Sequence, residues 1–206
     1  QKTAKQLDRY DKDNYYYLLP IFNRTYEIVA TNKWYQNFDS IITHCDNEIQ
    51  GILSDIDENP CMENIFYLKG QSLFYQKKYE DAIVVFSAMN DLFYQNPDAI
   101  LESYIGLFNC FFELKQYQQC QSILDSITHD FDSNELVKDL SYLYAISSLM
   151  LEMERWQESI NYLQIILAKK IPYQLRTRIL FILGQVYETI GEYNNAIVQY
   201  TEVSNR

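Results

Sequence analysis

The chain has 206 residues, of which 48% are hydrophobic and 16% aromatic, so the composition excludes an intrinsically disordered protein. It contains only 5 glycines and 4 prolines, too few for the frequent turns of an all-β domain or for glycine-built nucleotide loops. Acidic residues (28) outnumber basic ones (17), and the formal net charge of −11 argues against DNA, RNA or an anionic lipid surface as partner.

The N-terminal part is the least regular. It begins with Gln1 rather than methionine, so we expect a processed or excised piece of a longer protein, and its first residues are too polar for a secretory signal. Apolar residues around Pro20 predict a helix, and a helical spacing from Trp34 to about Leu53 predicts a second. We interpret residues 1–62 as a degenerate helical hairpin. No apolar run is long enough for membrane insertion.

Residues 63–206 contain a repeat. In two segments a glycine is followed by tyrosine, alanine and an aromatic residue after 9, 12 and 16 positions: Gly70, Tyr79, Ala82 and Phe86, then Gly184, Tyr193, Ala196 and Tyr200. An aromatic residue also recurs at intervals of 38, 39 and 37: Tyr79, Tyr117, Trp156 and Tyr193. Such a period predicts a stack of identical supersecondary units.

Each unit is expected to be a pair of antiparallel helices. A small residue on the first helix, such as Gly70 or Gly184, lets the second helix approach closely. We expect it to lie opposite a small residue of the second helix: Ala82, Cys120, Ser159 or Ala196. The aromatic residue at the turn is expected to close the open end. Phe108 stands where one unit should have a small residue, so that hairpin is expected to be splayed or shifted. One hairpin cannot bury its apolar face alone, so neighbours stack.

This pattern resembles the tetratricopeptide repeat, whose first-helix Leu-Gly pair is present at Leu183-Gly184 and whose aromatic-x-x-Ala start of the second helix is present at Tyr79 and Tyr193. The period of 37–39 exceeds the family's usual length of about 34. The resemblance implies an all-α, right-handed α-solenoid of about five hairpins, with four repeats over residues 63–206. It also implies a non-catalytic scaffold for protein–protein interaction.

Motifs for catalysis and cofactor binding are missing from the sequence. GxSxG, GxxxxGK[ST], HExxH and GxGxxG do not occur, and the two histidines, His44 and His129, lie in no ligand-spaced cluster. We therefore predict no enzyme activity and no cofactor, with a cryptic active site as the alternative.

Metal and disulfide sites are also disfavoured. Asp55, Asp57 and Asn59 imitate the opening of a calcium loop, but Pro60 and Phe66 stand where that loop needs glycine and glutamate. The four cysteines form no CxxC pair and are expected to be packed thiols: Cys45, Cys61, Cys110 and Cys120. A bridge between the third and the fourth is the alternative in an oxidising compartment.

In a tetratricopeptide-like array, one face of each first helix lines a concave groove. Counting from the aligned glycines assigns thirteen side chains to a partner-binding groove: Tyr67, Gln71, Phe74, Tyr75, Asn109, Phe112, Glu113, Tyr144, Ser148, Glu152, Phe181, Gln185 and Glu188. Aromatic rings beside amides suit a protein segment, and the column of three glutamates favours a neutral or basic one. The alternative is that the rings only pack between hairpins.

The last predicted helix ends with apolar Ile197, Tyr200 and Val203 and no polar capping helix. Repeat arrays need such caps. We therefore expect the natural chain to continue, or a partner or self-association to cover this end. Two alternative functions follow, an oligomerising module that uses this face and a regulatory arm of a longer chain.

Three segments in order are also similar to the tetratricopeptide lipoproteins of type IX secretion and gliding motility, the PorW/SprE kind: residues 18–22, 67–75 and 176–187. This likeness implies a bacterial periplasmic or outer-membrane-associated scaffold of a secretion assembly, although the lipoprotein's anchoring cysteine is absent from the chain. A BamD-like assembly lipoprotein is a neighbouring interpretation, and a cytoplasmic location is the alternative.

Overall fold

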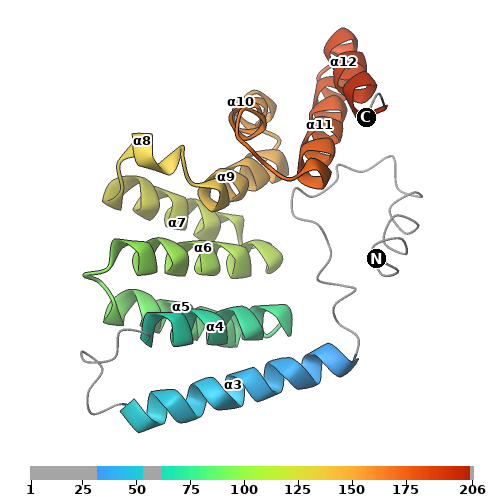
Figure 1. Ribbon diagram of the computed structural model, residues 1–206. Coiled ribbons are helices and arrows are strands. Elements are labelled where there is room, and N and C mark those ends of the chain that lie inside the picture. The colour runs from blue at the N-terminus through green and yellow to red at the C-terminus, as the bar shows by residue number, and fades with distance from the viewer. Residues whose placement is uncertain (1–31, 53–61, 205–206) are drawn as a thin grey trace. The chain divides into compact units, whose positions relative to one another are not determined.

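The computed structural model describes residues 32–52 and 62–204, and all regular secondary structure in these ranges is helical. Within the described ranges ten helices follow one another, mostly as consecutive hairpins (Figure 1), so the predicted all-α class of helical hairpins is confirmed. The predicted helix around Pro20, the calcium-like segment Asp55–Asn59 and Cys61 lie outside the described residues. The predicted domain boundary at residue 62 stays a prediction.

The chain divides into two compact parts, the first of which spans residues 29–133. It contains five helices: α3 (Asn32–Ile52), α4 (Met62–Tyr75), α5 (Tyr79–Leu92), α6 (Pro97–Glu113) and α7 (Tyr117–Asp130). Each packs against the next, with α5 between α4 and α6. Their core is built from buried apolar side chains that recur at helical spacing, among them Phe66, Leu73, Val85, Met89 and Leu107.

The second part includes residues 134–206. Its helices are α8 (Ser133–Leu136), which begins at the boundary, α9 (Leu140–Glu152), α10 (Trp156–Leu167), α11 (Tyr173–Thr189) and α12 (Tyr193–Ser204). Helix α9 pairs with α10, α11 pairs with α12, and α10 packs against α11. Leu143, Leu163, Ile166, Ile179 and Ile182 are fully buried in its core. No helix in the described ranges is long and apolar enough to cross a membrane.

The four repeats share one turn geometry. After each first helix (α4, α6, α9 and α11) a single residue takes a left-handed backbone conformation: Lys77 (φ 60°), Lys115 (φ 59°), Glu154 (φ 56°) and Gly191 (φ 81°). In the first turn the amide of Lys78 donates to the carbonyl of Leu73 (3.0 Å) and that of Lys77 to Phe74 (2.8 Å), and the other three turns repeat this pair of bonds. These are Schellman caps, and they reverse the chain at the same register each time.

The glycines of the first helices lie directly against aromatic rings, which the sequence analysis did not foresee. A Cβ on Gly70 would lie 2.6 Å from the ring of Phe86, and one on Gly106 would lie 2.6 Å from the same ring. Gly184 faces the ring of Tyr200 in the same way. The small residues of the second helices are buried too, and Ala82 is fully inaccessible to solvent. Gly70 and Gly184 thus make room for the aromatic residue 16 positions later, and Gly106 makes room for a ring of the preceding helix.

Where the first helix carries a larger residue, the residue 16 positions later is smaller than an aromatic ring. Phe108 is followed by Leu124, and Ser147 by Leu163. Phe108 is fully buried and stacks on Phe112 with ring centroids 5.7 Å apart. A larger residue at the first position is therefore matched by a smaller one 16 positions later, and α6 accommodates Phe108 in its core.

Candidate protein-interaction surface

All thirteen residues predicted for the groove lie on the first helices of the repeats, α4, α6, α9 and α11. They fall on both compact parts, so each part is described separately. Their exposure differs. Three glutamates are exposed (Glu113, Glu152 and Glu188), Ser148 and Gln185 are buried, and the remaining residues are half-buried.

On the first part, an aromatic and an amide side chain form a pair on α4. The Gln71 amide donates a hydrogen bond to the Tyr67 hydroxyl at 2.5 Å, and the Tyr67 ring lies 6.3 Å from that of Phe86. Asn109 is half-buried at the matching register of α6, which packs against α4. This part therefore presents two partly accessible amides on neighbouring helices.

The other predicted groove rings of the first part pack against neighbouring rings near the helix turns. Phe74 lies 5.4 Å from Tyr79, and Tyr75 stacks on Phe38 of α3 at 5.6 Å. Phe112 stacks on Phe108 and also lies 5.8 Å from Tyr117. These contacts favour a packing role for Phe74, Tyr75 and Phe112. The Tyr79 hydroxyl donates to Glu113 at 3.5 Å, which ties α5 to α6.

On the second part, the matching register of α9 and α11 is polar and buried. Ser148 is 5% exposed and Gln185 8%. The Ser148 hydroxyl oxygen is inaccessible and has no hydrogen-bond partner among the described residues. Burial also raises the pKa of Tyr144, one helical turn before Ser148. An unpaired buried hydroxyl costs free energy unless another group completes it.

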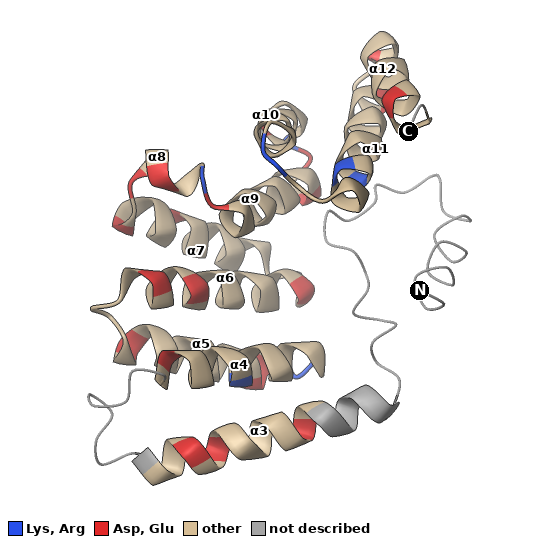
Figure 2. Ribbon diagram, in the orientation of Figure 1, with Lys and Arg blue, Asp and Glu red and all other residues tan. Residues whose placement is uncertain are grey.

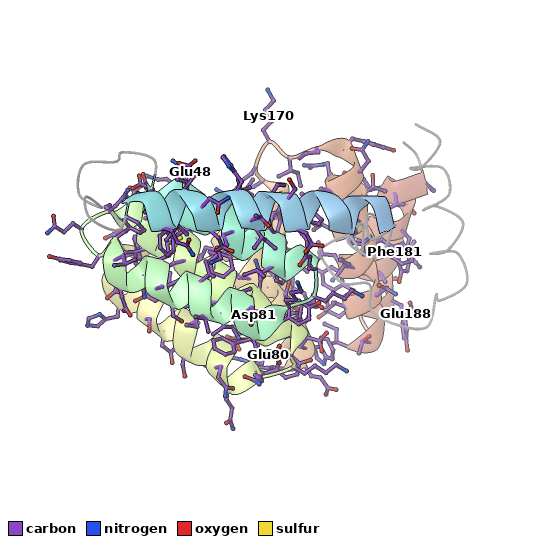
Figure 3. All side chains as sticks on the ribbon, turned by 90° about the horizontal axis from the view of Figure 1, so that it is seen from below. Glu48, Glu80, Asp81, Lys170, Phe181 and Glu188 are labelled. Carbon is purple, nitrogen blue, oxygen red and sulfur yellow. The ribbon has the colours of Figure 1, made fainter. Side chains whose placement is uncertain are left out.

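Helix α11 brings two predicted residues against α12. Phe181 lies 5.4 Å from the ring of Tyr200, and Glu188 accepts a hydrogen bond from the Tyr200 hydroxyl at 3.0 Å. Figure 3 labels Phe181 and Glu188 on this hairpin. Burial, together with the hydrogen bond and the charge of Glu188, raises the pKa of Tyr200 to about 12. Phe181 and Tyr200 thus pack within the hairpin.

The apolar residues named at the end of the chain have different positions. Ile197 is 60% exposed, whereas Tyr200 and Val203 are half-buried. Tyr193 (64% exposed) and Val198 (59%) complete the exposed apolar surface of α12, and sequence reasoning did not include them. Tyr193 therefore does not close its hairpin as expected of the turn aromatics. The repeat spacing itself could have pointed to Tyr193, since Tyr79 occupies the same register.

The sequence analysis also missed a polar contact between α3 and the first repeat. Gln76 is buried, and its amide donates to the Asp39 carboxylate at 2.8 Å. Lys78 lies 3.9 Å from the same carboxylate. Lys69 forms a second ion pair with Asp46 of α3 at 2.5 Å. The acidic residues of α3 carried no signal for these partners, because the partners lie 23 to 39 positions away in the sequence.

The described cysteines, Cys45, Cys110 and Cys120, are free buried thiols, as predicted, and the alternative bridge is not formed. Burial raises the pKa of Cys110 and of Cys120 to about 12, which makes them poor nucleophiles and poor metal ligands. Within residues 32–52 and 62–204, no group of three or more His, Cys, Asp or Glu side chains is arranged to hold a metal ion.

Comparison with known proteins agrees with the repeat pattern. Residues 73–141 match the family model of the tetratricopeptide repeat, so the resemblance drawn from the sequence is confirmed. No curated protein matches the chain.

Two solved structures have a similar fold, both of nearly identical TPR-like repeats from a proposed kinesin light chain of Podosopora anserina. One is a single-substitution variant, with a TM-score of 0.62 at 16% identity over 90% of this chain and 94% of that one. The other has a TM-score of 0.60 at 15% identity over 91% and 95%.

Proposed function

We propose that this protein is a scaffold that binds segments of other proteins on the first helices of its repeats, in each compact part by itself. Tetratricopeptide repeats are protein-interaction modules, and residues 73–141 match their family model. The fold alone does not assign a partner or a site, so the proposal depends on the chemistry of the helix faces.

One observation carries the proposal. In each repeat, a neutral hydrogen-bonding residue directly follows the aligned position of the first helix (Gly70, Phe108, Ser147 or Gly184). These four residues are Gln71, Asn109, Ser148 and Gln185. These four are half-buried or buried, where an aliphatic side chain would pack at lower cost. Amides and hydroxyls at a constant register suit the carbonyl and amide groups of an extended or helical chain. The buried Ser148 hydroxyl has no hydrogen-bond partner within the described residues. This is expected of a group that accepts a hydrogen bond from such a partner chain.

The charge of the scaffold restricts the partner. Acidic side chains outnumber basic ones on the described helices (Figure 2), and Glu113, Glu152 and Glu188 are exposed on three of the first helices. Like charges at an interface are repelled, so the proposed partner segment is neutral or basic. A lysine- and arginine-based clamp for an acidic tail does not fit, because the matching positions carry Gln, Asn, Ser and Glu.

The test is a selection of peptides from a random displayed library on the purified chain. Selected peptides should be neutral or basic, and the double variant Gln71→Ala with Asn109→Ala should weaken them about tenfold. Gln118→Ala is the matched control, since Gln118 is an exposed amide on α7. Circular dichroism melting confirms that each variant folds. Peptides that are acidic, or that bind the double variant and the wild type equally, would refute the groove.

The cell-envelope role is a finer proposal that rests on the sequence likeness to the type IX secretion lipoproteins alone. It places the scaffold in the periplasm, linked to components of a secretion assembly. Fractionation of the source cells with an antibody to this chain tests it. Recovery in the cytosolic fraction alone would remove the envelope role and leave the scaffold proposal intact.

A further inference from the structure

The first part has a partly accessible face on which apolar residues accompany the amides of the proposed groove. Leu68 of α4 is 47% exposed and lies one helical turn before Gln71. Ile105 of α6 is half-buried and lies one turn before Asn109. Residues one turn apart project from the same side of a helix, and α4 packs against α6. These four residues therefore form a mixed apolar and amide surface, which we call the α4–α6 face.

The sequence contains a segment with a composition that suits this face. Residues 15–22 are eight consecutive aromatic, aliphatic or proline residues: Tyr15, Tyr16, Tyr17, Leu18, Leu19, Pro20, Ile21 and Phe22. A run of this kind gains free energy when it leaves water, so it favours contact with an apolar surface. Its peptide groups still need hydrogen-bond partners there, and the amides of Gln71 and Asn109 can supply them.

Helix α3, which follows this segment in the sequence, does not offer such a surface. To pack on α3 as the first half of a hairpin, residues 15–22 would need an apolar outer face on that helix. Among residues 38–51, the exposed residues of α3 are polar or glycine: Asp39, Ser40, Thr43, His44, Asn47, Gln50 and Gly51. The apolar residues Ile42 and Ile49 instead pack against the core of the first part.

The position of α3 brings residues 15–22 within reach of the α4–α6 face. Phe38 of α3 stacks on Tyr75, at the C-terminal end of α4. Asn32, where α3 begins, is six residues from Phe38, which is about 9 Å of helix. Leu68 is seven residues from Tyr75, which is about 10 Å. The nine residues 23–31 span up to about 30 Å when extended, so they are long enough to connect the two.

Charge favours this segment on the first part. Residues 1–31 contain five basic and four acidic residues, whereas residues 32–133 contain five basic and sixteen acidic ones. Residues 134–206 are nearly balanced, with seven and eight. The excess negative charge therefore lies in the first part, and Figure 2 shows acidic residues on α3, α5 and α6. A neutral to weakly basic segment is complementary to that part.

The α4–α6 face has a carboxylate of its own. Glu102 is exposed and lies one turn before Ile105. Burial, together with the charges of Asp98 and Glu63, raises the pKa of Glu102, so further negative charge here is unfavourable. The described lysine side chains of the first part lie toward α3 or in the turns after α4 and α6: Lys69, Lys77, Lys78 and Lys115.

Attachment to α3 makes the segment a strong competitor for the face. A short flexible linker gives an effective concentration on the order of 1 mM. A tethered segment whose own dissociation constant is roughly 0.1 mM then occupies its site about nine-tenths of the time and weakens a competing peptide about tenfold.

We propose that residues 15–22 bind the α4–α6 face of their own chain and compete there with segments of other proteins. This inference rests on the proposed function, because it concerns the regulation of one of the surfaces that the scaffold uses. The first part is then closed until a partner segment with higher affinity displaces residues 15–22.

Photo-crosslinking in the full 206-residue chain tests the contact directly. Leu68 is replaced by p-benzoylphenylalanine, and the products are mapped by mass spectrometry after trypsin, which cleaves at Lys12 and Arg24 and so releases residues 15–22 in one peptide. The expected result is a link from position 68 to residues 15–22 in a product of monomer mass. The control carries the same amino acid at Val84, an exposed position on α5 (69%) outside the face.

Three outcomes of this experiment would overturn the proposal. The first is that no link forms between position 68 and residues 15–22. The second is that the link forms only in a product of dimer mass, which would make a second copy the occupant. The third is that position 84 links to residues 15–22 as efficiently as position 68 does.

A competition experiment tests the regulation. The probe is a fluorescent synthetic peptide with the sequence of residues 13–24, titrated by anisotropy. The double variant Leu18→Asp with Ile21→Asp should bind the probe about tenfold more tightly than the wild type, because its own segment no longer competes. Thr3→Asp with Gln6→Asp makes the same charge change outside residues 15–22 and should bind like the wild type. Equal affinity of the wild type and the Leu18/Ile21 variant would contradict the proposal.

Peptides from the displayed library separate this inference from the proposed function. They should bind the Leu18/Ile21 variant about tenfold more tightly than the wild type, and Gln71→Ala with Asn109→Ala should weaken them in both backgrounds. Equal binding to the two chains that still depends on Gln71 and Asn109 would leave the scaffold intact and overturn the inference. Binding that depends on neither amide in either chain would overturn the proposed groove, and the inference with it.

Discussion

The ring of Phe86 fills the space that a side chain on Gly70 would need. A Cβ at Gly70 would lie 2.6 Å from one ring atom and 2.7 Å from another, well inside the ordinary contact distance. Because Gly106 touches the same ring, Phe86 cannot move aside without disturbing α6. Close packing of this kind leaves little room for relaxation.

We therefore expect Gly70→Ala to destabilise the protein by about 1 to 3 kcal/mol through overpacking. The double variant Gly70→Ala with Phe86→Leu should lose less than the sum of the two single changes, because it recreates a pairing similar to Ser147 with Leu163. Urea unfolding of the four proteins measures the coupling.

Gly51→Ala is the control, since nothing lies within 4 Å of a Cβ at that exposed helical position. It should stabilise the protein by up to about 1 kcal/mol, because alanine is the better helix former. Additive losses at Gly70 and Phe86 would contradict the packing account.

Substitutions to glycine and from glycine in the hairpin turns should have opposite effects on stability. Lys77, Lys115 and Glu154 have positive φ angles, which are unfavourable for residues with a Cβ. Replacement of Lys115 by glycine should stabilise the protein by about 0.5 to 1 kcal/mol, while Gly191→Ala should destabilise it by a similar amount. Thermal unfolding measures both. A loss of stability in Lys115→Gly would indicate that its side chain makes contacts that outweigh the backbone strain.

Helix capping differs between α9 and α7. The carboxylate of Asp139 accepts a hydrogen bond from the amide of Tyr142 at 2.7 Å and caps α9. Asp139→Ala should cost about 1 kcal/mol of stability, measured by chemical denaturation. Gln116 occupies the same position before α7 but makes no side-chain capping bond, so Gln116→Ala should have little effect. Equal losses in the two variants would argue against the cap.

The buried thiols predict a loss of stability at alkaline pH. Burial raises the pKa of Cys120 from its ordinary value of 9.0 to about 12. The folded state therefore keeps its proton to a higher pH than the unfolded chain does. The contribution of this group to the free energy of unfolding is constant below about pH 9 and decreases between about pH 9 and 12, by at most about 1.4 kcal/mol per pH unit.

Cys120→Ala removes this group and places alanine where two other repeats carry Ala82 and Ala196. Its unfolding free energy should decrease less steeply than that of the wild type above pH 9, and the difference between the two should not change between pH 6 and 8. Urea titrations at several pH values measure this. Parallel curves up to pH 12 would show that the thiol does not titrate differently in the two states.

Much of the helical architecture follows from local sequence. The spacing of Tyr79, Tyr117, Trp156 and Tyr193 marks the start of the second helix in all four repeats, and the structure places a helix start at each of them. This is predictable because a helix exposes its side chains with a fixed period, and a repeat multiplies that signal. The candidate groove residues were assigned to first helices for the same reason, and all thirteen lie there.

The contacts of those residues were not predictable in the same way. Register alone could not distinguish a half-buried amide at Asn109 from a buried one at Gln185, or show that Phe112 stacks on Phe108. Burial depends on the volume of side chains about one repeat away, which periodicity does not report. Proposals for the groove therefore depend on the structure for their polar residues and on experiment for their partner.

The repeat, its helical hairpins, the lack of familiar catalytic motifs and the acidic character are all predictable from the sequence, because each depends on composition or on fixed intervals along the chain. The packing of the helices was needed to show that Phe86 and Tyr200 fill the space beside Gly70 and Gly184. It also decided that Tyr193 and Ile197 remain exposed although their counterparts in α5 are half-buried. The reason is that a helix specifies which residues share a face, whereas the neighbouring helix decides what covers that face.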